Sequence, residues 1–307
     1  AIAAGHGCSE TPKPSVYGAT GHTLSVACGR LSHLLGLTGP CLSVDTACSA
    51  TPAAMHLTCD ALSLRECCSA VMCAAGLMLD AGPSVLTSVA GMLSPAGRCH
   101  TFDGRADGYS RAEGAVAAVF HSVSGNDGSD SEQTSVLMLG LAVQQDGASA
   151  SLTAPNGTSQ RRLLRAVCEA TGLSTQQPGS AEAHGTGTAL GDPIEVGAVA
   201  DAFGVGRPLS AVLLLGAVKA NAGHLENTAG GAGMVASVEV VLERSSSVGC
   251  AQLRRLNSKL AVPISTEGGA GMCAEVCVVG ESGGAVFGGL SSFGYSGTVG
   301  HCSQCVS

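Results

Sequence analysis

Residues 44–52 read VDTACSATP, a run of small residues that follows an aliphatic segment. From residue 54 to residue 65, apolar residues recur at intervals of three and four, which predicts an amphipathic helix. We therefore expect Cys48 to lie at a helix N-terminus, where the helix dipole and the free backbone N–H groups favour the thiolate. Taken alone, one cysteine among fifteen is more often a small buried residue than a nucleophile.

Short apolar runs and segments of helical spacing alternate along the rest of the chain. The runs predict strands over residues 70–75, 114–120, 136–143, 211–218 and 286–291, the last leading into the glycine-rich GYSGTVG. Helical spacing predicts helices over residues 159–170 and 226–242, and a third that starts at Asp192 as the N-cap residue. Alternating strands and helices indicate an α/β fold of packed layers with buried sheets.

A polar stretch, SGNDGSDSEQ at residues 124–133, is the best boundary between two halves. It divides the chain into a first half at residues 1–123 and a second half at residues 134–307. Both halves contain alternating strands and helices, so we expect two related halves that pack closely together.

The composition argues against several classes of partner. The chain has 307 residues, and its net charge of −8 argues against a nucleic-acid partner, which requires a basic face. No apolar run approaches the ~18 residues that a transmembrane helix needs, so we predict no membrane span. We expect a cytoplasmic protein; because the chain opens on AIAAGHG without a methionine, a plastid is the alternative location.

Fifteen cysteines are many, and most of them lie among apolar residues, as small hydrophobic side chains do in a reducing compartment. Cys273 and Cys277, followed by Cys302 and Cys305, have ligand-like spacing, so a zinc-stabilised, non-catalytic scaffold is one alternative. One CxxxC beside one CxxC is a weaker signal than paired CxxC motifs, and we predict no metal site.

Two histidine motifs indicate a site. EAHGTGTALGDPIE at 182–195 places His184 at the end of a predicted strand, before a glycine–threonine loop. VKANAGHLE at 218–226 places Lys219 and His224 in a similar position after the next predicted strand. Because sites in α/β proteins gather at the carboxyl ends of strands, both histidines are candidate site residues.

Six motifs, in order along the chain, resemble the β-ketoacyl synthase (ketosynthase) domain of modular polyketide synthases and the related fatty-acid condensing enzymes. They are VDTACSA, LSPAGRCHTFDGRADGYSRAEG (93–114), QDGASASLTAPNG (145–157), EAHGTGTALGDPIE, VKANAGHLE and SSFGYSGT (291–298). The separations of 136 residues from Cys48 to His184 and of 40 residues from His184 to His224 also agree with the family. The resemblance runs from about Val16 to Thr298, nearly the whole chain.

The resemblance implies a thiolase-like fold in which two related halves stack in αβαβα layers, and a homodimer. It implies that Cys48 is the nucleophile that takes an acyl chain from a phosphopantetheine thioester. His184 and His224 would bind the thioester carbonyl of a malonyl-type unit and stabilise the enolate that forms when CO2 leaves. The backbone N–H groups of Cys48 and Tyr295 would bind the second oxyanion, on the acyl carbonyl.

Further roles follow from the same resemblance. Thr186 and Thr188 match positions that contact the pantetheine arm, and Lys219 and Glu195 match a pair that supports the histidines. The resemblance implies that the domain binds no cofactor of its own and that substrates arrive on the phosphopantetheine of an acyl carrier protein. The implied partners are that carrier protein and the acyltransferase and other domains of a larger synthase.

The chain departs from the family pattern in the glycine loop and at its start. Tyr295 replaces a gating Phe and Val299 replaces an Asn, so we expect the loop to lose hydrogen bonds that brace it. The family also has a long segment before the point where this chain begins. We therefore expect part of the first half's sheet and part of the dimer surface to be missing from this chain.

Two other readings stay within or near the family. One is a non-elongating or inactive ketosynthase-like protein, against which the retained Cys48 counts, because such proteins typically replace the cysteine. The other is a thiolase, which uses a second reactive cysteine in a CxG motif that Cys302-Ser303-Gln304 does not match.

A docking surface for the carrier protein requires local positive charge, because carrier proteins are typically acidic and this chain is acidic too. Two clusters of arginines are candidates: Arg161, Arg162 and Arg165 on one predicted helix, and Arg98, Arg105 and Arg111 in the 93–114 segment. For any single arginine, a solvated charge or an internal ion pair is an equally good reading.

Overall fold

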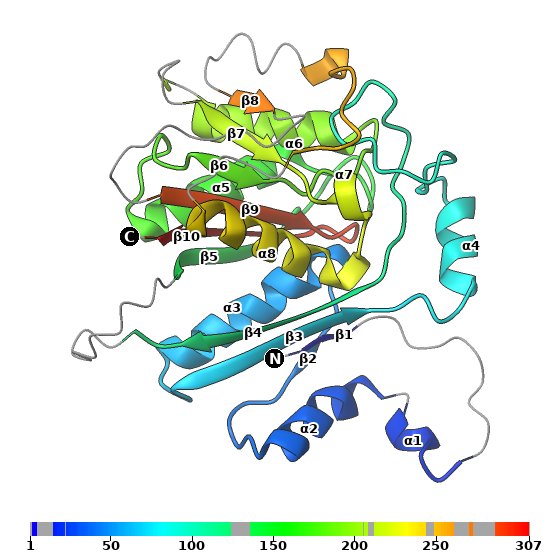
Figure 1. The fold of residues 1–307 in the computed structure, drawn as a ribbon, viewed down its shortest axis with the longest axis vertical. Helices are drawn as coiled ribbons and strands as arrows, with labels where there is room; N and C mark the ends of the chain where they lie inside the picture. Colours follow the sequence, from blue (N-terminus) through cyan, green and yellow to red (C-terminus); the bar gives the residue numbers. More distant parts are fainter. Residues whose placement is uncertain are drawn as a thin grey trace.

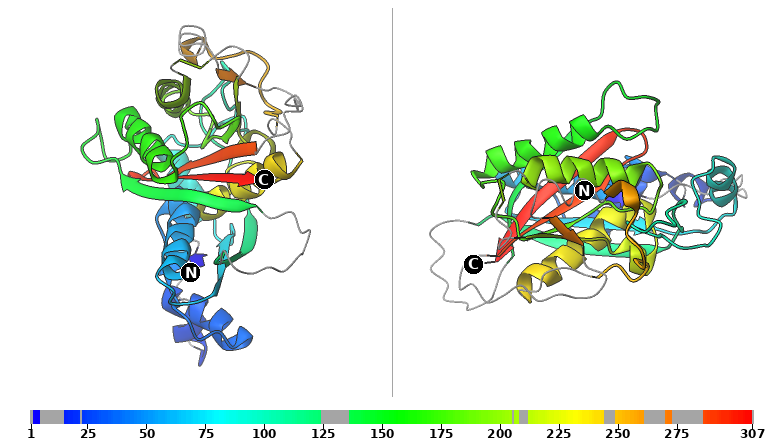
Figure 2. Two further views of the ribbon diagram at one scale, coloured as in Figure 1. Left: turned by 90° about the vertical axis from the view of Figure 1, so that its left-hand side faces the viewer. Right: turned by 90° about the horizontal axis from the view of Figure 1, so that it is seen from above.

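The computed structural model describes residues 2–4, 15–21, 23–123, 136–204, 206–207, 212–243, 249–260, 270–272 and 286–306. In this part of the chain, two β-sheets are stacked with two helices between them and further helices on their outer faces (Figure 1). The side view in the left panel of Figure 2 shows the same layers stacked along the long axis. The predicted layered α/β fold is confirmed.

The first sheet contains four described strands in the order β2-β1-β3-β4. They are β1 (Ile2–Ala4), β2 (Ser43–Val44), β3 (Ser69–Gly76) and β4 (Gly114–His121). β1 pairs in parallel with β2 and β3, and β4 runs antiparallel to β3. The short helix α1 (Gly18–Gly21), helix α2 (Leu24–Leu35) and, near the far end of β3, α4 (Gly82–Val89) lie outside this sheet (Figure 1).

The second sheet contains six described strands in the order β5-β10-β9-β6-β7-β8. They are β5 (Leu137–Gln145), β6 (Ser180–Glu182), β7 (Leu213–Gly216), β8 (Ala270–Met272), β9 (Val286–Phe293) and β10 (Thr298–Val306). β10 is antiparallel to both of its neighbours, whereas β9, β6, β7 and β8 run parallel. Helices α5 (Gly157–Thr171) and α6 (Gly191–Val199) cover the outer face, and α6 continues into a wider helical turn at Ala200–Gly204.

Helices α3 (Ala50–Ser63) and α8 (Ala229–Leu242) form the middle layer between the sheets (Figure 1). A Cβ added at Gly230 would lie 2.7 Å from Pro52 Cδ, and one at Gly231 would lie 3.1 Å from Val116 Cβ. Glycine therefore lets α8 approach both α3 and the first sheet closely. This close approach explains how a chain with 3% aromatic residues packs its interior.

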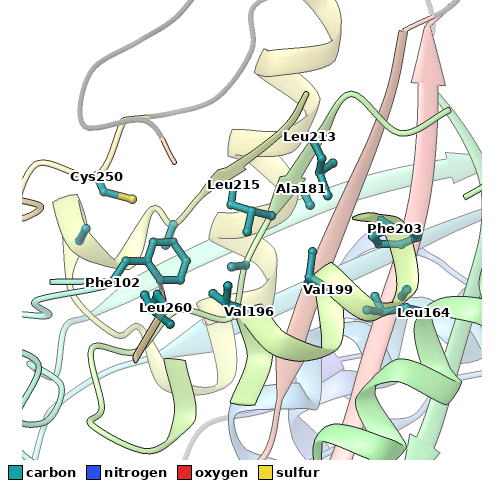
Figure 3. Close-up of a cluster of buried hydrophobic side chains, with 14 of the residues drawn as sticks. Phe102, Leu164, Ala181, Val196, Val199, Phe203, Leu213, Leu215, Cys250 and Leu260 are labelled. Atoms are coloured by element: carbon teal, nitrogen blue, oxygen red, sulfur yellow. The ribbon is translucent and has the colours of Figure 1, made fainter. Parts of the chain in front are cut away.

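A second buried cluster lies between the second sheet and its outer helices (Figure 3). Phe102 and Phe203 are its largest side chains, and they pack with leucines and valines of α5, α6 and β7. Phe102 reaches this cluster from the first half of the chain. The two halves consequently share a core, as closely packed halves should.

Four details of the predicted elements change in the structure. The strand expected at 211–218 is the shorter β7, and the helix expected from residue 226 begins at Ala229, after a 3-10 turn at Glu226–Thr228. Asp192 is not the N-cap of α6, because Leu190 occupies that place. Its carboxylate instead accepts hydrogen bonds from the backbone N–H groups of Phe102 (2.8 Å) and Gly187 (3.1 Å).

The fourth change is that β9 is not the last strand. After a tight turn, β10 runs back between β5 and β9, and every residue from Val299 to Val306 is buried. Polar residues such as His301, Ser303 and Gln304 interrupt the apolar pattern that would predict this strand, although each is less than 3% exposed.

Among the described residues, no helix has the length and apolar character needed to cross a lipid bilayer.

Candidate active site

Cys48 lies in a 3-10 turn (Ala47–Ser49) that starts two residues after β2 and runs directly into α3. Ala47 has φ of +55°, a conformation that is costly for alanine, and its N–H donates to Asp45 Oδ1 at 2.9 Å. On the other side, Ser292 Oγ at the end of β9 donates to the Cys48 carbonyl oxygen at 2.7 Å. The cysteine therefore lies at the entrance to a helix, as predicted, and is held from both sheets.

The expected preference for a thiolate at Cys48 is wrong for the resting protein. Burial raises the pKa of the Cys48 thiol to about 12. The positive charge of Lys219 and the backbone N–H groups of Cys48 and Tyr295 lower it, but they do not outweigh desolvation. Cys48 is thus a neutral thiol at pH 7, and both N–H groups face its sulfur.

His224 follows α7 (Lys219–Ala222) and places its ring directly on the cysteine, with Nε2 3.1 Å from Cys48 Sγ. Its Nδ1 accepts a hydrogen bond from the Glu226 N–H at 2.9 Å. Because Nδ1 is an acceptor, the proton of the neutral ring lies on Nε2. Burial, followed by the charges of Lys219 and Arg111, holds the pKa of His224 well below its usual value.

His184 lies two residues beyond β6 and has the same arrangement. Its Nδ1 accepts from the Phe293 N–H at 3.2 Å, which places the ring proton on Nε2. Burial, followed by Lys219 and His224, holds the pKa of His184 well below its usual value. The two rings meet edge to face with centroids 5.7 Å apart, so the site contains two neutral N–H donors side by side.

Glu195 and Lys219 are both buried, at 3% and 2% exposure, but they do not form a direct pair. Glu195, on α6, accepts from the backbone N–H groups of His184 (2.7 Å) and Gly185 (2.8 Å). Burial raises the pKa of Glu195 to about 7. Among the described side chains, no ion pair within 4.0 Å joins it to Lys219, whose charge acts on both histidines from its buried position.

A pocket of about 320 Å³ connects these groups to the surface. The predicted site residues that line it are Cys48, His184, Thr186, Thr188, Glu195, His224 and Tyr295. The Thr186 and Thr188 hydroxyls are 3.3 Å apart on one wall, and Tyr295 is half exposed at the mouth. Lys219 is the one predicted site residue that does not line the pocket.

Three residues with a part in this geometry were not predicted from the sequence. Tyr109 packs its ring against His224 with centroids 4.8 Å apart, Phe293 fixes His184 through its N–H, and Glu226 fixes His224 in the same way. All three lie inside the quoted motifs. Their position in the motifs was the signal, but backbone hydrogen bonds to a ring nitrogen leave no trace in a sequence pattern.

The glycine loop is braced in spite of Val299. Gly294 N–H donates to the Thr298 carbonyl at 2.7 Å, and Gly297 N–H donates to the Gly294 carbonyl at 2.9 Å. Val299 is 1% exposed and packs with Leu163 and Phe293. An aliphatic side chain at this position fills the core, and backbone groups close the turn.

The arginine clusters differ from the expected docking surfaces. The Arg111 side chain is only 6% exposed and pairs with Glu226, and Arg105 pairs with the buried Asp103. Arg161, Arg162 and Arg165 do lie on α5, where Arg161 pairs with Asp201 at 2.8 Å. The prediction that Arg111 lies on a docking surface is therefore wrong, whereas Arg98, Arg105, Arg162 and Arg165 are exposed.

The zinc alternative falls partly outside the described residues, because Cys273 and Cys277 lie there. Cys302 and Cys305 are buried on β10. In the part of the chain that the structure describes, no group of three or more His, Cys, Asp or Glu side chains could hold a metal ion.

Two family models match the chain. That of the β-ketoacyl synthase N-terminal domain matches residues 4–125, and that of the C-terminal domain matches residues 136–246. A phenolphthiocerol/phthiocerol polyketide synthase of Mycobacterium tuberculosis is 40% identical over 284 residues, which are 92% of this chain and 13% of that protein. A mycocerosic acid synthase-like polyketide synthase of Mycolicibacterium smegmatis is 36% identical over 222 residues, which are 72% of this chain and 10% of that protein.

Solved structures give the same result. The ketosynthase from module 6 of the bacillaene synthase of Bacillus subtilis superimposes with a TM-score of 0.87 at 28% identity, over 100% of this chain and 52% of that one. The oxazolomycin ketosynthase domain of Streptomyces albus gives a TM-score of 0.85 at 28% identity, over 93% of this chain and 50% of that one. The chain thus spans about half the length of these ketosynthases and about an eighth or less of the curated relatives.

Proposed function

The chain belongs to the β-ketoacyl synthase family, and on that basis we propose that it joins an acyl chain to a malonyl-type unit by decarboxylative Claisen condensation. The observation that carries the proposal is the matched pair of histidines beside Cys48. Both rings have Nδ1 engaged by a backbone N–H, so both carry their proton on Nε2 and both stay neutral.

The first step is transfer of the acyl chain to Cys48. The sulfur attacks the carbonyl carbon of an acyl thioester, the carbon–sulfur bond to the pantetheine arm breaks, and the Cys48 proton ends on the departing thiol. The N–H groups of Cys48 and Tyr295 that face the sulfur would donate to the oxyanion. The neutral thiol means that the proton must leave Cys48 during attack, when the substrate has displaced water from the pocket.

The second step is decarboxylation of a malonyl thioester. The bond to the carboxylate breaks, CO2 leaves, and the electron pair moves onto the thioester carbonyl as an enolate. Two neutral Nε2–H groups, from His184 and His224, would donate to that oxygen as its charge develops. Neutral donors suit this role because burial holds the pKa of each histidine well below its usual value, so the two rings do not gain protons and repel each other.

The third step forms the carbon–carbon bond. The enolate carbon attacks the acyl carbonyl on Cys48, the bond to the Cys48 sulfur breaks, and the sulfur takes a proton from the solvent to return to the thiol. The product is a β-ketoacyl thioester on the arm that delivered the malonyl unit. The pocket wall with Thr186 and Thr188 supports the proposal that this arm is a phosphopantetheine.

Separation of the two half-reactions tests this function. His184→Ala and His224→Ala are expected to accept an acyl group on Cys48 while releasing CO2 from malonyl thioester roughly 100-fold more slowly. His56→Ala is the matched control, because His56 lies on α3 and its side chain is 40% exposed. Equal loss of acylation and decarboxylation in both variants would contradict the assignment, and acylation of the unaltered chain without CO2 release would favour a non-elongating relative.

We further propose that the substrates arrive on an acyl carrier protein, in a synthase with acyltransferase and other domains, and that the unit is a homodimer. Exposed Arg162 and Arg165 on α5 support a docking surface there. Charge reversal at these two residues, or added salt, should slow acylation from carrier protein and leave acylation from a small pantetheine thioester unchanged.

We propose that the protein is located in the cytoplasm, with a plastid as the alternative; cell fractionation tests this location.

A further inference from the structure

Arg111 and Glu226 form a two-pronged ion pair beside the site that the reaction steps above do not use. Arg111 Nε lies 2.5 Å from Glu226 Oε1, and Nη2 lies 2.9 Å from Oε2. The two side chains are 6% and 16% exposed. Arg111 also donates to Ser84 Oγ on α4, so its guanidinium is held at both ends. A buried pair of this geometry restrains both side chains strongly.

Glu226 is also the residue whose backbone N–H binds His224 Nδ1. Its φ is +52°, in the left-handed region that a non-glycine residue adopts at a cost. In this conformation one residue presents its N–H to the imidazole and its carboxylate to Arg111. The ion pair therefore offsets the strain of the backbone conformation that keeps the N–H on Nδ1.

Arg111 is fixed relative to His224 by the backbone as well. His224 N–H donates to the Ser110 carbonyl at 2.7 Å, and Ala112 N–H donates to the His224 carbonyl at 2.9 Å. The residues on both sides of Arg111 thus pair with His224 as a short parallel bridge. The backbone on either side of Arg111 thus binds His224, and the Arg111 guanidinium binds Glu226, whose N–H binds His224 Nδ1.

We propose that Arg111 and Glu226 are positioning residues that fix the tautomer and the orientation of His224. The inference rests on the proposed function of His224 as a donor to the enolate. With the Glu226 N–H in place, Nδ1 can only accept and Nε2 must carry the proton that faces Cys48. Without it, the ring can carry its proton on Nδ1 and turn the Nε2 lone pair toward the pocket, where it would repel the enolate oxygen.

The test compares Glu226→Gln and Arg111→Lys with the unaltered chain. Both variants lose the two-pronged ion pair but keep the backbone N–H at residue 226. Asp103→Asn is the matched control, because Asp103 forms a two-pronged pair with Arg105 and has a fully buried side chain. Asp103→Asn should reproduce any loss of stability that follows from breaking a buried ion pair, and it should leave the tautomer of His224 unchanged.

The first measurement is NMR of isotope-labelled histidine nitrogens, which reports the tautomer of His224 without any need for turnover. We expect the Nδ1–H form to appear in both variants and to be absent from the unaltered chain and the control. The second measurement is kinetics: decarboxylation should slow by roughly 10- to 100-fold while Cys48 acylation and the KM for malonyl thioester change by less than about threefold.

A variant that keeps His224 in the Nε2–H form, at an unaltered decarboxylation rate, overturns the proposal. So does one in which both half-reactions slow together while the tautomer is unchanged. If Glu226→Gln does not fold, Arg111→Lys decides, since it keeps the positive charge in the buried position. If the unaltered chain releases no CO2, the proposed function fails, and the tautomer measurement alone still decides the positioning role.

Discussion

Gly294→Ala adds one methyl group where the glycine turn touches the nucleophile segment. A Cβ there would lie 2.6 Å from the Thr46 carbonyl oxygen and 2.8 Å from Ser49 Oγ. The first distance is about 0.8 Å shorter than ordinary van der Waals contact at 3.4 Å. Gly294 also donates to the Thr298 carbonyl at 2.7 Å, so the turn cannot relax on its own side without losing that hydrogen bond.

The added methyl must therefore push the turn away from Cys48. Overpacking of this kind costs about 1–3 kcal/mol of stability. Tyr295, the next residue, moves with the turn. Its N–H, which faces the Cys48 sulfur in the unaltered chain, then moves away from that sulfur. Because loss of one oxyanion donor slows acyl transfer by about 100- to 1,000-fold, a partial withdrawal should slow Cys48 acylation by roughly 10- to 100-fold.

Acylation of Cys48 from a pantetheine thioester, followed by intact mass, measures the effect alongside urea unfolding. Gly197→Ala is the matched control, because Gly197 lies in α6 and an added Cβ meets nothing within 4 Å. It should raise the free energy of unfolding by about 0.5–1 kcal/mol and leave acylation unchanged. If Gly294→Ala acylates and unfolds like the unaltered chain, the turn does not hold the oxyanion donor as described.

Two other properties follow from the buried polar groups. Burial raises the carboxyl pKa of both Glu182 and Glu195 to about 7, above the ordinary 4.5, so the folded chain binds protons that the unfolded chain releases. The free energy of unfolding, measured with urea, should thus fall by up to ~3 kcal/mol per group as pH rises from about 5 to about 8. Glu195→Gln should make this fall less steep. A free energy of unfolding that rises over the same pH range would contradict the prediction. Ser292→Ala removes the 2.7 Å hydrogen bond to the Cys48 carbonyl and should cost about 1 kcal/mol in the same assay, whereas an unchanged midpoint would show that water replaces the hydroxyl.

The sequence was most informative where the chemistry is local to a motif. Cys48 and His184 each lie a few residues after a short strand, His224 lies after the short helix α7 that follows β7, and all three line one pocket. Their placement could be predicted because the carboxyl ends of strands in such folds bring separate motifs together. The strands β3, β4 and β5 were predicted as well, because each contains a continuous apolar run.

The sequence was least informative where distant segments determine a property. The thiol pKa of Cys48 depends on how many groups from both halves bury the sulfur, and a helix-terminus argument alone gives the wrong direction. β10 was missed because polar residues interrupt its apolar pattern, although the sheet buries them; His301, for example, lies with Nδ1 2.9 Å from Ser291 Oγ on β9. Arg111 looked like a surface charge because its partner, Glu226, is 115 residues away.

The central claim is that acyl transfer occurs on Cys48 and condensation on the adjacent histidines. Intact-mass analysis tests it most directly, after incubation with an acyl pantetheine thioester and again after addition of malonyl thioester. The account predicts an acyl adduct that maps to Cys48, is absent from Cys48→Ala, and disappears with release of CO2 and formation of a β-ketoacyl thioester. An adduct of the same mass that persists in Cys48→Ala, or an adduct on Cys48 that malonyl thioester never removes, would contradict it.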